Sequence, residues 1–357
     1  MDNTKLDSKK SDAFAEKMIR VLNSGALALM TSISHQTGIF DSLKGMSPAT
    51  SDQIASESGL NERYVREWLG AMVTGGIIEC NPKGPLYSLP PEHAVWLTRD
   101  ATPNNIAVFA QYIPLLGSVE DRVVECFKEG GGVPYSAYKK FHRVMAEDSG
   151  QTVVAALIDH ILQLVPGLVS ALRNGINVLD VGCGRGRALN LMGKTFPKSQ
   201  FTGYDFSEEA ISAGVKEANN FDLINVRFEE KDVTTLQEDS QYDLVTAFDA
   251  IHDQVSPDSV LAGIARALKP DGTFLMQDIA ASSHVFNNID HPVGPLLYTI
   301  SCMHCMTVSL SENGAGLGAM WGEEKAIEML HEAEFTKIDV RKLQHDFQNS
   351  YYIVKKN

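Results

Sequence analysis

The sequence predicts an α/β protein, with a doubly wound open sheet in the second half of the chain and a small helical domain before it. From residue 177 onward, short apolar segments rich in β-branched residues alternate with segments of helical periodicity. Strands that alternate with helices lie parallel to their neighbours and are joined by right-handed crossovers. The first 100 residues instead contain helical segments and one short hairpin. With 357 residues, the chain is long enough for two domains.

Residues 1–100 are expected to form a winged helix. Apolar residues recur at helical spacing through residues 13–43. Thr50 and Gln53 have the spacing of a capping box, and Asn61 can cap the next helix. Two short apolar runs separated by the turn Asn-Pro-Lys-Gly then predict a hairpin. Helices followed by a hairpin are the order of elements in a winged helix.

Winged helices often bind DNA, but the second of these helices is poorly suited to that task. It carries two arginines and two glutamates and is otherwise largely apolar, with Trp68 near its middle. The formal net charge of the chain is −14, whereas DNA binding depends on an excess of lysine and arginine. We therefore expect this domain to form a homodimer, and we do not expect nucleic acid as a partner.

The composition indicates an ordinary globular protein of the cytoplasm. Hydrophobic residues make up 44% of the chain and charged residues 21%. The sequence begins with a polar segment and contains no run of 18 apolar residues, so we expect no signal peptide and no contact with a membrane. The 5 cysteines are scattered along the chain, which favours reduced thiols.

Residues 101–176 are expected to be a helical linker and cap region. Three glycines before Pro134 interrupt the helical pattern, so a loop is predicted from Gly130 to Tyr135. This loop is either a plain connector or a support for aromatic residues that reach a ligand of the next domain. In the second case, Tyr138 and His142 would line a substrate pocket.

Residues 177–357 contain the strands and helices of the predicted sheet. Pro257 lies in the first turn of one helix, and Pro270 follows the end of that helix. Residues 279–321 form a long insertion after the fifth strand, and we expect it to cap the substrate site because loops of this length are usually functional. The predicted strands are residues 178–181, 201–205, 224–232, 242–251, 272–278, 337–343 and 349–356, and the helices are residues 187–196, 207–219, 256–268 and 323–335.

The first strand runs into the sequence Asp-Val-Gly-Cys-Gly-Arg-Gly, residues 180–186. Gly182, Gly184 and Gly186 allow a tight turn and a close approach of a ligand to the backbone. Asp205 ends the second strand and is placed to accept both hydroxyls of a ribose. A dinucleotide would use a similar site, but its fingerprint is G-x-G-x-x-G, and Asp180 would repel a pyrophosphate. Asp180 would instead attract a cationic ligand.

This pattern resembles the class I S-adenosylmethionine-dependent methyltransferases, which implies a Rossmann-like sheet over residues 177–357. The resemblance implies that Gly182 and Gly184 lie against the methionine part of the cofactor, with Asp180 near its amino group. Asp205 would hold the ribose and Asp232 the adenine, although Asp232 could also serve only as a cap after a strand. The implied cofactor contacts are Asp180, Gly182, Gly184, Gly186, Asp205, Phe206, Asp232, Val233 and Phe248.

A second resemblance, to the small-molecule O-methyltransferases of plant and bacterial natural-product type, extends over both domains. The segment Ala-Ile-His-Asp-Gln, residues 250–254, corresponds to the motif that supplies the catalytic histidine in that family, which implies His252 as the base and Asp253 as its neighbour. Gln254 departs from the tryptophan that the family prefers. The layout is also similar to a set of bacterial and animal methyltransferases that carry the same His-Asp-Gln element.

Histidine suits this chemistry, because an imidazole can take the proton of an acceptor hydroxyl near neutral pH. His252 could alternatively shape the loop, or orient an amine or a thiol acceptor. The insertion is rich in apolar residues, which indicates a largely apolar pocket wall. The candidates for the substrate pocket are Tyr138, His142, Tyr298, Met303 and Trp321.

No metal is expected at Cys302 and Cys305, although their spacing is that of a metal-binding pair. A structural zinc site needs a second pair of ligands, and the sequence offers only scattered histidines at 284, 291 and 304. The segment around the two cysteines has the character of an apolar helix, which would carry both as small buried residues.

The sequence therefore predicts an enzyme that transfers a methyl group from S-adenosylmethionine to a small molecule, at a hydroxyl in the favoured case, and releases S-adenosylhomocysteine. Two alternatives stay open at this point. One is a nucleic-acid or protein methyltransferase that docks through the winged helix, and the other is a cofactor-sensing regulator without catalysis. The acceptor, and the choice among oxygen, nitrogen, sulfur and carbon, are not specified by the sequence.

Overall fold

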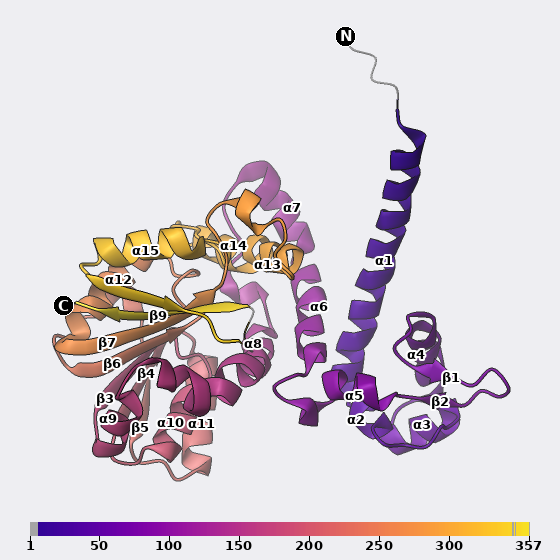
Figure 1. The fold of residues 1–357 in the computed structure, drawn as a ribbon, viewed down its shortest axis with the longest axis horizontal. Coiled ribbons are helices and arrows are strands. Elements are labelled where there is room, and N and C mark those ends of the chain that lie inside the picture. Colours follow the sequence, from indigo (N-terminus) through magenta and orange to yellow (C-terminus); the bar gives the residue numbers. More distant parts are fainter. Residues whose placement is uncertain (1–5, 345, 347, 357) are drawn as a thin grey trace. The chain divides into compact units, whose positions relative to one another are not determined.

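In the computed structural model, residues 6–344, 346 and 348–356 are described. The chain divides into two compact units, Met1–Leu115 and Leu116–Asn357 (Figure 1). None of the helices in the described part of the chain combines the length and the apolar composition needed to cross a lipid bilayer.

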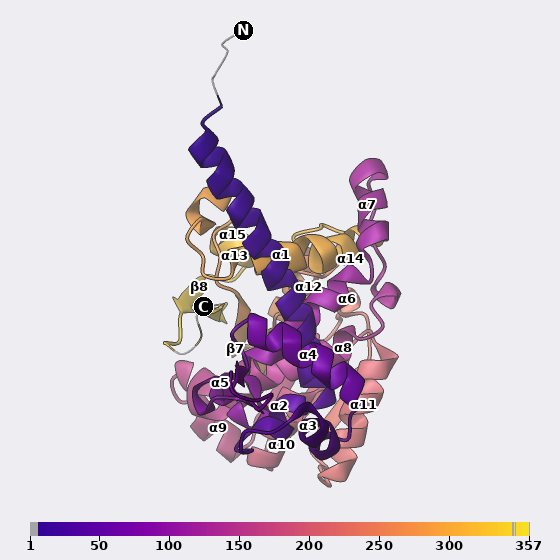
Figure 2. The same ribbon diagram turned by 90° about the vertical axis from the view of Figure 1, so that its right-hand side faces the viewer.

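The first unit has the predicted winged-helix order of elements. A long helix, α1 (Ser8–Thr37), is followed by α2 (Ile39–Leu43), α3 (Ser51–Ser58) and α4 (Glu62–Thr74) (Figure 2). The strands β1 (Glu79–Cys80) and β2 (Tyr87–Ser88) then pair antiparallel, and α5 (Pro91–Leu97) follows. Their core contains Phe40, Leu43, Ile54, Trp68, Leu69 and Met72.

The local sequence signals explain where these helices begin. The Thr50 hydroxyl accepts the Gln53 backbone N–H at 3.3 Å, and the Gln53 side chain accepts the Thr50 N–H at 2.9 Å. Both halves of the predicted capping box are therefore present. The Asn61 side chain accepts the backbone N–H of Arg63 at 3.1 Å and so caps α4, as predicted.

The second unit is built on a seven-stranded sheet with the order β5-β4-β3-β6-β7-β9-β8. The predicted doubly wound α/β fold is confirmed, since β3 to β7 pair in parallel. Only β9 runs antiparallel to its neighbours β7 and β8, because the segment between β8 and β9 is too short for a crossover helix. The strands are β3 (Asn177–Val181), β4 (Gln200–Asp205), β5 (Val226–Glu230), β6 (Tyr242–Phe248), β7 (Leu268–Ile279), β8 (Lys337–Arg341) and β9 (Asn349–Lys355).

Helices cover both faces of this sheet (Figure 1). On one face, α12 (Pro257–Ala267) and α15 (Gly322–Glu332) pack on a core that includes Leu179 and Val245. On the other face, α9 (Leu168–Asn174) and α10 (Arg187–Thr195) pack on a core that includes Val178 and Leu244. Consecutive strand residues thus point to opposite cores, which is why these strands are apolar throughout. Beside α10, α11 (Glu208–Asn220) completes the crossover between β4 and β5.

The predicted cap region and the insertion after β7 lie against each other within this unit. Residues 130–141 contain the interrupting glycines and the short helix η3 (Tyr135–Ala137), between α7 (Glu120–Glu129) and α8 (Phe141–Ser149). The insertion forms α13 (Gly294–Ile300), a π-helical turn η9 (Ser301–Cys305) and α14 (Met306–Ser311). The Thr307 hydroxyl accepts the backbone N–H of Val133 at 2.9 Å. A side chain at Gly132 would place its Cβ 2.0 Å from the Thr307 carbonyl oxygen, so this contact requires glycine.

Candidate active site

The turn after β3 uses its three glycines for different reasons. All three have positive φ angles, 69° at Gly182, 53° at Gly184 and 68° at Gly186. A Cβ at Gly182 would lie 2.5 Å from the Ala250 side chain, and one at Gly186 would lie 2.3 Å from the Phe228 ring. At Gly184, nothing within the described chain lies within 4 Å of such a Cβ. Gly184 therefore leaves space that a ligand can enter, whereas the other two glycines allow the chain to pack on itself.

Asp205 ties this turn to the end of β4. Its two carboxylate oxygens accept the backbone N–H of Gly184 at 2.8 Å and that of Ser207 at 2.9 Å. Burial raises the pKa of Asp205 above its ordinary value, although these two N–H bonds oppose the shift. The carboxylate lies at the carboxyl edge of the sheet, where ligands of such folds bind.

Asp180 is a buried carboxylate directly before the glycine turn. One of its oxygens accepts the Thr246 hydroxyl at 2.7 Å, across the pairing of β3 with β6. Burial raises the pKa of Asp180 to about 7, and the nearby Asp205 adds to the shift. A cationic group beside Asp180 would lower this pKa and stabilise the charged form.

The remaining cofactor candidates follow the carboxyl ends of β4, β5 and β6. Asp232 caps the short helix η7 (Val233–Thr235) and accepts the backbone N–H of Thr234 at 2.9 Å and its hydroxyl at 2.7 Å. The capping alternative for Asp232 is thus present in the structure, while an adenine contact stays a prediction. Val233 is buried in the core, Phe206 is exposed after β4, and Phe248 is partly buried at the end of β6.

His252 is held by an acid that the sequence reasoning missed. Its Nδ1 lies 2.8 Å from Oδ1 of Asp278, near the end of β7, and both side chains are buried. Burial alone would lower the pKa of His252, but the Asp278 carboxylate and the neighbouring Cys305 thiol outweigh it and hold this pKa well above its ordinary value. The sequence did contain a signal for Asp278. It is an acidic residue at the end of a predicted strand, and strand ends of this kind lie at the same edge of the sheet as His252.

Asp253 is not the residue that orients His252. It is partly buried, and burial raises its pKa to about 6, while the neighbouring His252 opposes the shift and Asp205 adds to it. Asp253 therefore lies among the same charged groups as the cofactor candidates, but the carboxylate that accepts the hydrogen bond of the imidazole is that of Asp278.

An aromatic wall connects the cap region with the insertion. We use this name for Tyr135, Tyr138, Phe141, His142 and His304. The Phe141 and His304 rings are stacked, with centroids 3.7 Å apart, and Tyr138 meets His304 edge-on at 4.7 Å. Tyr135 contacts Phe206 at 5.2 Å, which brings the wall to the cofactor candidates. His142 pairs with Glu209 at 3.2 Å, and burial lowers the pKa of His142.

The predicted pocket residues divide between this wall and other places. Tyr138 and His142 belong to the wall, and the Tyr138 hydroxyl donates to the Met303 carbonyl oxygen on η9. The Tyr298 hydroxyl accepts a hydrogen bond from Asn288 at 2.9 Å within the insertion. Trp321 lies in the core formed with α12 and α15, so the structure does not bring it to the wall. Its predicted contact with a substrate has no support from this position.

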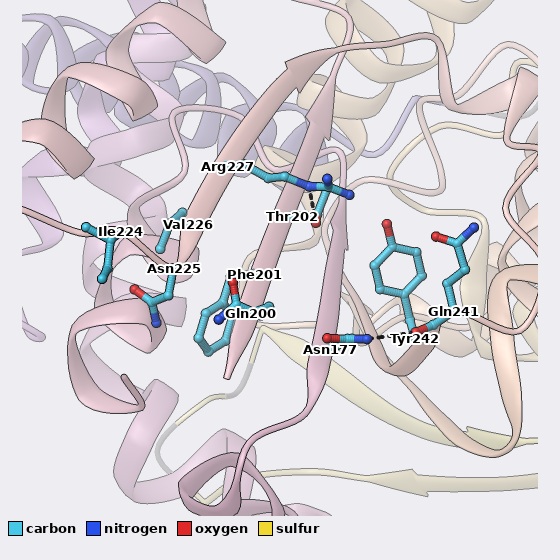
Figure 3. Close-up of a pocket in the computed structure, with 10 residues that line it drawn as sticks. All are labelled: Asn177, Gln200, Phe201, Thr202, Ile224, Asn225, Val226, Arg227, Gln241 and Tyr242. Carbon is cyan, nitrogen blue, oxygen red and sulfur yellow. Dashed lines mark hydrogen bonds between the residues drawn. The ribbon is translucent and has the colours of Figure 1, made fainter. Parts of the chain in front are cut away.

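Two other features of this unit bear on where a ligand would bind. A surface hollow of about 300 Å³ lies where β3, β4 and β6 begin, lined by residues such as Asn177, Gln200 and Gln241 (Figure 3). It is at the opposite edge of the sheet from the glycine turn. In the portion of the chain that the structure describes, no three His, Cys, Asp or Glu residues are grouped so that they could hold a metal ion.

Two family models match the chain. Residues 25–99 match the family described as Rv2258c-like winged HTH domain. Residues 172–343 match the family described as Methyltransferase domain. The second match includes the glycine turn, Asp205, His252 and Asp278.

The curated relatives match over shorter stretches. A fatty-acid O-methyltransferase of Mycolicibacterium smegmatis is 31% identical over 105 residues, which are 29% of this chain and 37% of the relative. An (S)-coclaurine N-methyltransferase of Papaver somniferum is 28% identical over 108 residues, which are 30% of this chain and 31% of the relative. This chain therefore spans about a third of the length of these relatives.

Solved structures are similar over the whole chain. The mitomycin 7-O-methyltransferase MmcR has a TM-score of 0.71 and 16% sequence identity, covering 98% of this chain and 100% of that one. Human N-acetylserotonin methyltransferase in complex with S-adenosylmethionine has a TM-score of 0.69 and 15% identity, with complete coverage of both chains. At such identities, the likeness establishes a shared fold.

Proposed function

We propose that the chain, in which residues 25–99 match a winged helix-turn-helix domain and residues 172–343 match a methyltransferase domain, is a class I S-adenosylmethionine-dependent enzyme that methylates a hydroxyl group of a small molecule, with His252 as the base. The observation that carries this proposal is the buried pair of His252 and Asp278, with 2.8 Å between Nδ1 and Oδ1. The pair lies at the same edge of the sheet as the glycine turn, and a base is needed where a hydroxyl must lose its proton.

The residues of the glycine turn fit S-adenosylmethionine. The cofactor supplies an electrophilic methyl group on a positively charged sulfur. The open space at Gly184 accommodates the methionine part, with Gly182 and Gly186 shaping the turn. Asp180, a buried acid with a raised pKa, suits the cationic amino group. Asp205 would bind the ribose, and the adenine would lie near Asp232, Val233, Phe206 and Phe248.

The hydrogen bond from Asp278 fixes how His252 can act. When the Nδ1 proton is donated to Asp278, the neutral imidazole presents the lone pair of Nε2 to the acceptor. Nε2 would then take the proton of an acceptor hydroxyl whose oxygen accepts the methyl group that bound S-adenosylmethionine would supply, with S-adenosylhomocysteine as the leaving group. General base catalysis of this kind typically contributes on the order of a hundred- to ten-thousandfold in rate.

Positioning of the acceptor contributes further. Holding two reactants in line is worth on the order of 7 to 11 kcal/mol of the barrier. The aromatic wall lies between Phe206 and the insertion and supplies an apolar surface for this purpose. We assign the wall to acceptor binding and keep Met303 and Tyr298 as further candidates for the same role.

In this proposal, the winged-helix domain serves to form a homodimer. The arginines of α4 are engaged within the helix, since Arg63 pairs with Glu67 and Arg66 with Glu62, each at 2.6 Å. These ion pairs would compete with contacts between the arginines and DNA phosphates, so they disfavour binding of this helix to DNA. In contrast, α1 exposes a row of large apolar side chains that includes Phe14, Ile19 and Leu22. We propose that a second copy of the chain covers this row, because exposed apolar rows of this kind mark protein interfaces.

Two experiments test the proposed activity in sequence. Calorimetry first measures the binding of S-adenosylhomocysteine to the purified full-length protein. Incubation with S-adenosylmethionine carrying a labelled methyl group and with metabolite extracts then reveals the acceptor. The proposal expects a labelled small molecule, and expects the H252A variant to bind the cofactor but form little of that product. Labelling of added nucleic acid or protein instead would overturn it.

A further inference from the structure

His304 is a buried polar side chain that the proposed chemistry does not use. It is 0% exposed and lies on the π-helical turn η9. Neither Nδ1 nor Nε2 of its ring has a hydrogen-bond partner among the described residues. A buried polar group without a partner costs stability, so such a residue requires an explanation. Turns of π-helix are rare and occur frequently at functional sites.

The surroundings of His304 are aromatic. Its ring is stacked on Phe141, and the edges of Tyr138 and Tyr135 meet it at 4.7 and 5.4 Å. The next residue, Cys305, is close enough to His252 to help raise its pKa, so the wall continues to the base. The nearby His252 and His142 act together with burial to lower the pKa of His304 to about 3. The imidazole is therefore neutral and offers one donor and one acceptor.

The charges around the wall select against an anionic acceptor. Glu209 contacts His142 of the wall at 3.2 Å, and burial, with Asp253, Asp205 and Glu209 adding to its effect, raises the pKa of Tyr135, so carboxylates lie near the wall. Arg185 pairs with Glu209 at 3.1 Å, which offsets its charge. An acceptor carrying a carboxylate would thus meet like charges and a neutral imidazole, an unfavourable setting for an anion.

We infer that His304 binds an uncharged polar group on a planar acceptor, a group other than the hydroxyl that His252 deprotonates. This inference rests on the proposed function, because it places the acceptor between the aromatic wall and His252. It goes beyond that function by assigning to His304 the selection of acceptors that carry a second, uncharged polar group. The cost of one of the two unpartnered nitrogens in the ligand-free protein is offset when the acceptor binds.

Three naphthalene derivatives that share one ring system test the inference. They are 2-naphthol, 2,3-dihydroxynaphthalene and 3-hydroxy-2-naphthoate, which differ only in the second substituent. Binding to the full-length protein is measured by calorimetry in the presence of saturating S-adenosylhomocysteine. For the wild type we expect the diol to bind about tenfold more tightly than 2-naphthol, the worth of one buried hydrogen bond. The carboxylate should bind no better than 2-naphthol.

Two variants show whether His304 causes this preference. H304F keeps a ring in the stack but removes both nitrogens, so it should bind the diol and 2-naphthol within about twofold of each other. H284F is the matched control, because exposed His284 is also stacked on a phenylalanine, Phe286, with centroids 5.3 Å apart. It should keep the wild-type preference. A preference that survives in H304F, or tighter binding of the carboxylate, overturns the inference.

Two further outcomes separate this inference from the proposed function. If S-adenosylhomocysteine binds but none of the three naphthalenes does, the inferred acceptor class is wrong and the proposed methyl transfer stands. If S-adenosylhomocysteine itself does not bind, the proposed function fails. A thermal melt of ligand-free H304F tests the role of His304 independently of binding. Because the substitution removes unpartnered nitrogens, the Tm of H304F should be equal to or higher than that of the wild type. A Tm lowered by more than about 3 °C would make His304 a structural residue and refute its role in binding.

Discussion

The Oδ1 atom of Asp278 accepts two hydrogen bonds at 2.8 Å, one from the His252 ring and one from the backbone N–H of Ile279. The backbone contact fixes the carboxylate on β7, and the carboxylate in turn fixes the ring. Oδ2 of Asp278 has no hydrogen-bond partner within the part of the chain that the structure covers. Ser350 lies opposite Asp278 in the β7–β9 pairing, and its buried hydroxyl likewise has no partner among the described residues.

Replacement of His252 by asparagine should abolish most of the turnover. We expect a loss on the order of a hundred- to ten-thousandfold, because the acceptor hydroxyl then has no base. The affinity for S-adenosylhomocysteine should stay within about threefold of the wild type, since the glycine turn is untouched. Rates of labelled-methyl transfer and calorimetry measure the two quantities. Unchanged turnover across a range of pH would assign His252 a purely structural role.

Replacement of Asp278 by asparagine should change the pH profile as well as the rate. In the wild type, the raised pKa of His252 means that turnover increases with pH through a midpoint above the ordinary histidine value. Without the negative charge, burial dominates and lowers this pKa, so the midpoint should move to lower pH. The maximal rate should fall on the order of a hundredfold, because the ring loses its orientation.

The exposed pair of Asp339 and Arg341 provides the control for this variant. D339N removes the same charge from a neighbouring part of the sheet without touching His252, and it should leave the pH profile in place. A D278N profile with the wild-type midpoint would show that Asp278 does not act on the histidine.

Much of the fold was predictable, because it depends on local signals. The capping box at Thr50, the glycine turn and the alternation of strands and helices each occupy a short stretch of sequence. The alternation gave no direction for β9, which follows β8 without a crossover helix and runs antiparallel to both of its neighbours. That outcome depends on the length of one connection rather than on any residue type.

The site was less predictable, because its decisive contacts join distant segments. Asp278, which holds the His252 ring, is 26 residues from it, whereas the motif pointed only to the adjacent Asp253. Tyr138 and Met303 are 165 residues apart. Phe141 and His304 form the stack of the aromatic wall, yet neither residue shows any pattern that pairs it with the other. Trp321 was expected in the pocket because it is a large apolar residue of the insertion, but it is part of the core.

Substitution of Gly184 by alanine should remove cofactor binding at a small cost in stability. The added Cβ meets nothing within 4 Å, so the cost comes from the positive φ of 53°, on the order of 1 to 2 kcal/mol. The same methyl group should occupy the space of the cofactor and weaken S-adenosylhomocysteine binding at least tenfold. Calorimetry and urea unfolding measure the two effects.

Gly45 gives a matched control for this substitution. It has a φ of 71° with nothing within 4 Å of the added Cβ, and it lies in the winged-helix unit. G45A should therefore show a similar loss of stability but unchanged affinity for S-adenosylhomocysteine. Equal affinities in G184A and G45A would mean that the space at Gly184 is not used by the cofactor.

Replacement of Asp180 by asparagine should stabilise the ligand-free protein at high pH. The pKa of Asp180 in the folded protein, about 7, lies above its ordinary value of 3.8, so the folded state binds more protons than the unfolded state between these values. The associated stability is complete below pH 3.8 and is lost as the pH rises through 7. D180N should avoid this loss, so its free energy of unfolding at pH 8 should exceed that of the wild type by on the order of 2 to 4 kcal/mol.

Urea unfolding at pH 5 and pH 8 measures the change in D180N. The free energy of unfolding should rise relative to the wild type at pH 8 more than at pH 5, while affinity for S-adenosylmethionine falls at least tenfold. A destabilised D180N at pH 8 would contradict the raised pKa, because the wild type would then gain from the ionised carboxylate.

The proposed dimer depends on the apolar row of α1. A charged residue at exposed Leu22, as in L22D, should convert a dimer into a monomer at micromolar concentration, because burying an unpaired charge in an interface is costly. Sedimentation velocity distinguishes the two states. A wild-type protein that sediments as a monomer would remove the proposed partner of this helix.

The most direct test of the central claim is a calorimetric titration of the wild-type protein with S-adenosylhomocysteine and, separately, with NAD. The glycine turn, the space at Gly184 and the buried Asp180 predict heat and a single binding site per chain for S-adenosylhomocysteine, and no heat for NAD. Binding of NAD without any response to S-adenosylhomocysteine would contradict the account.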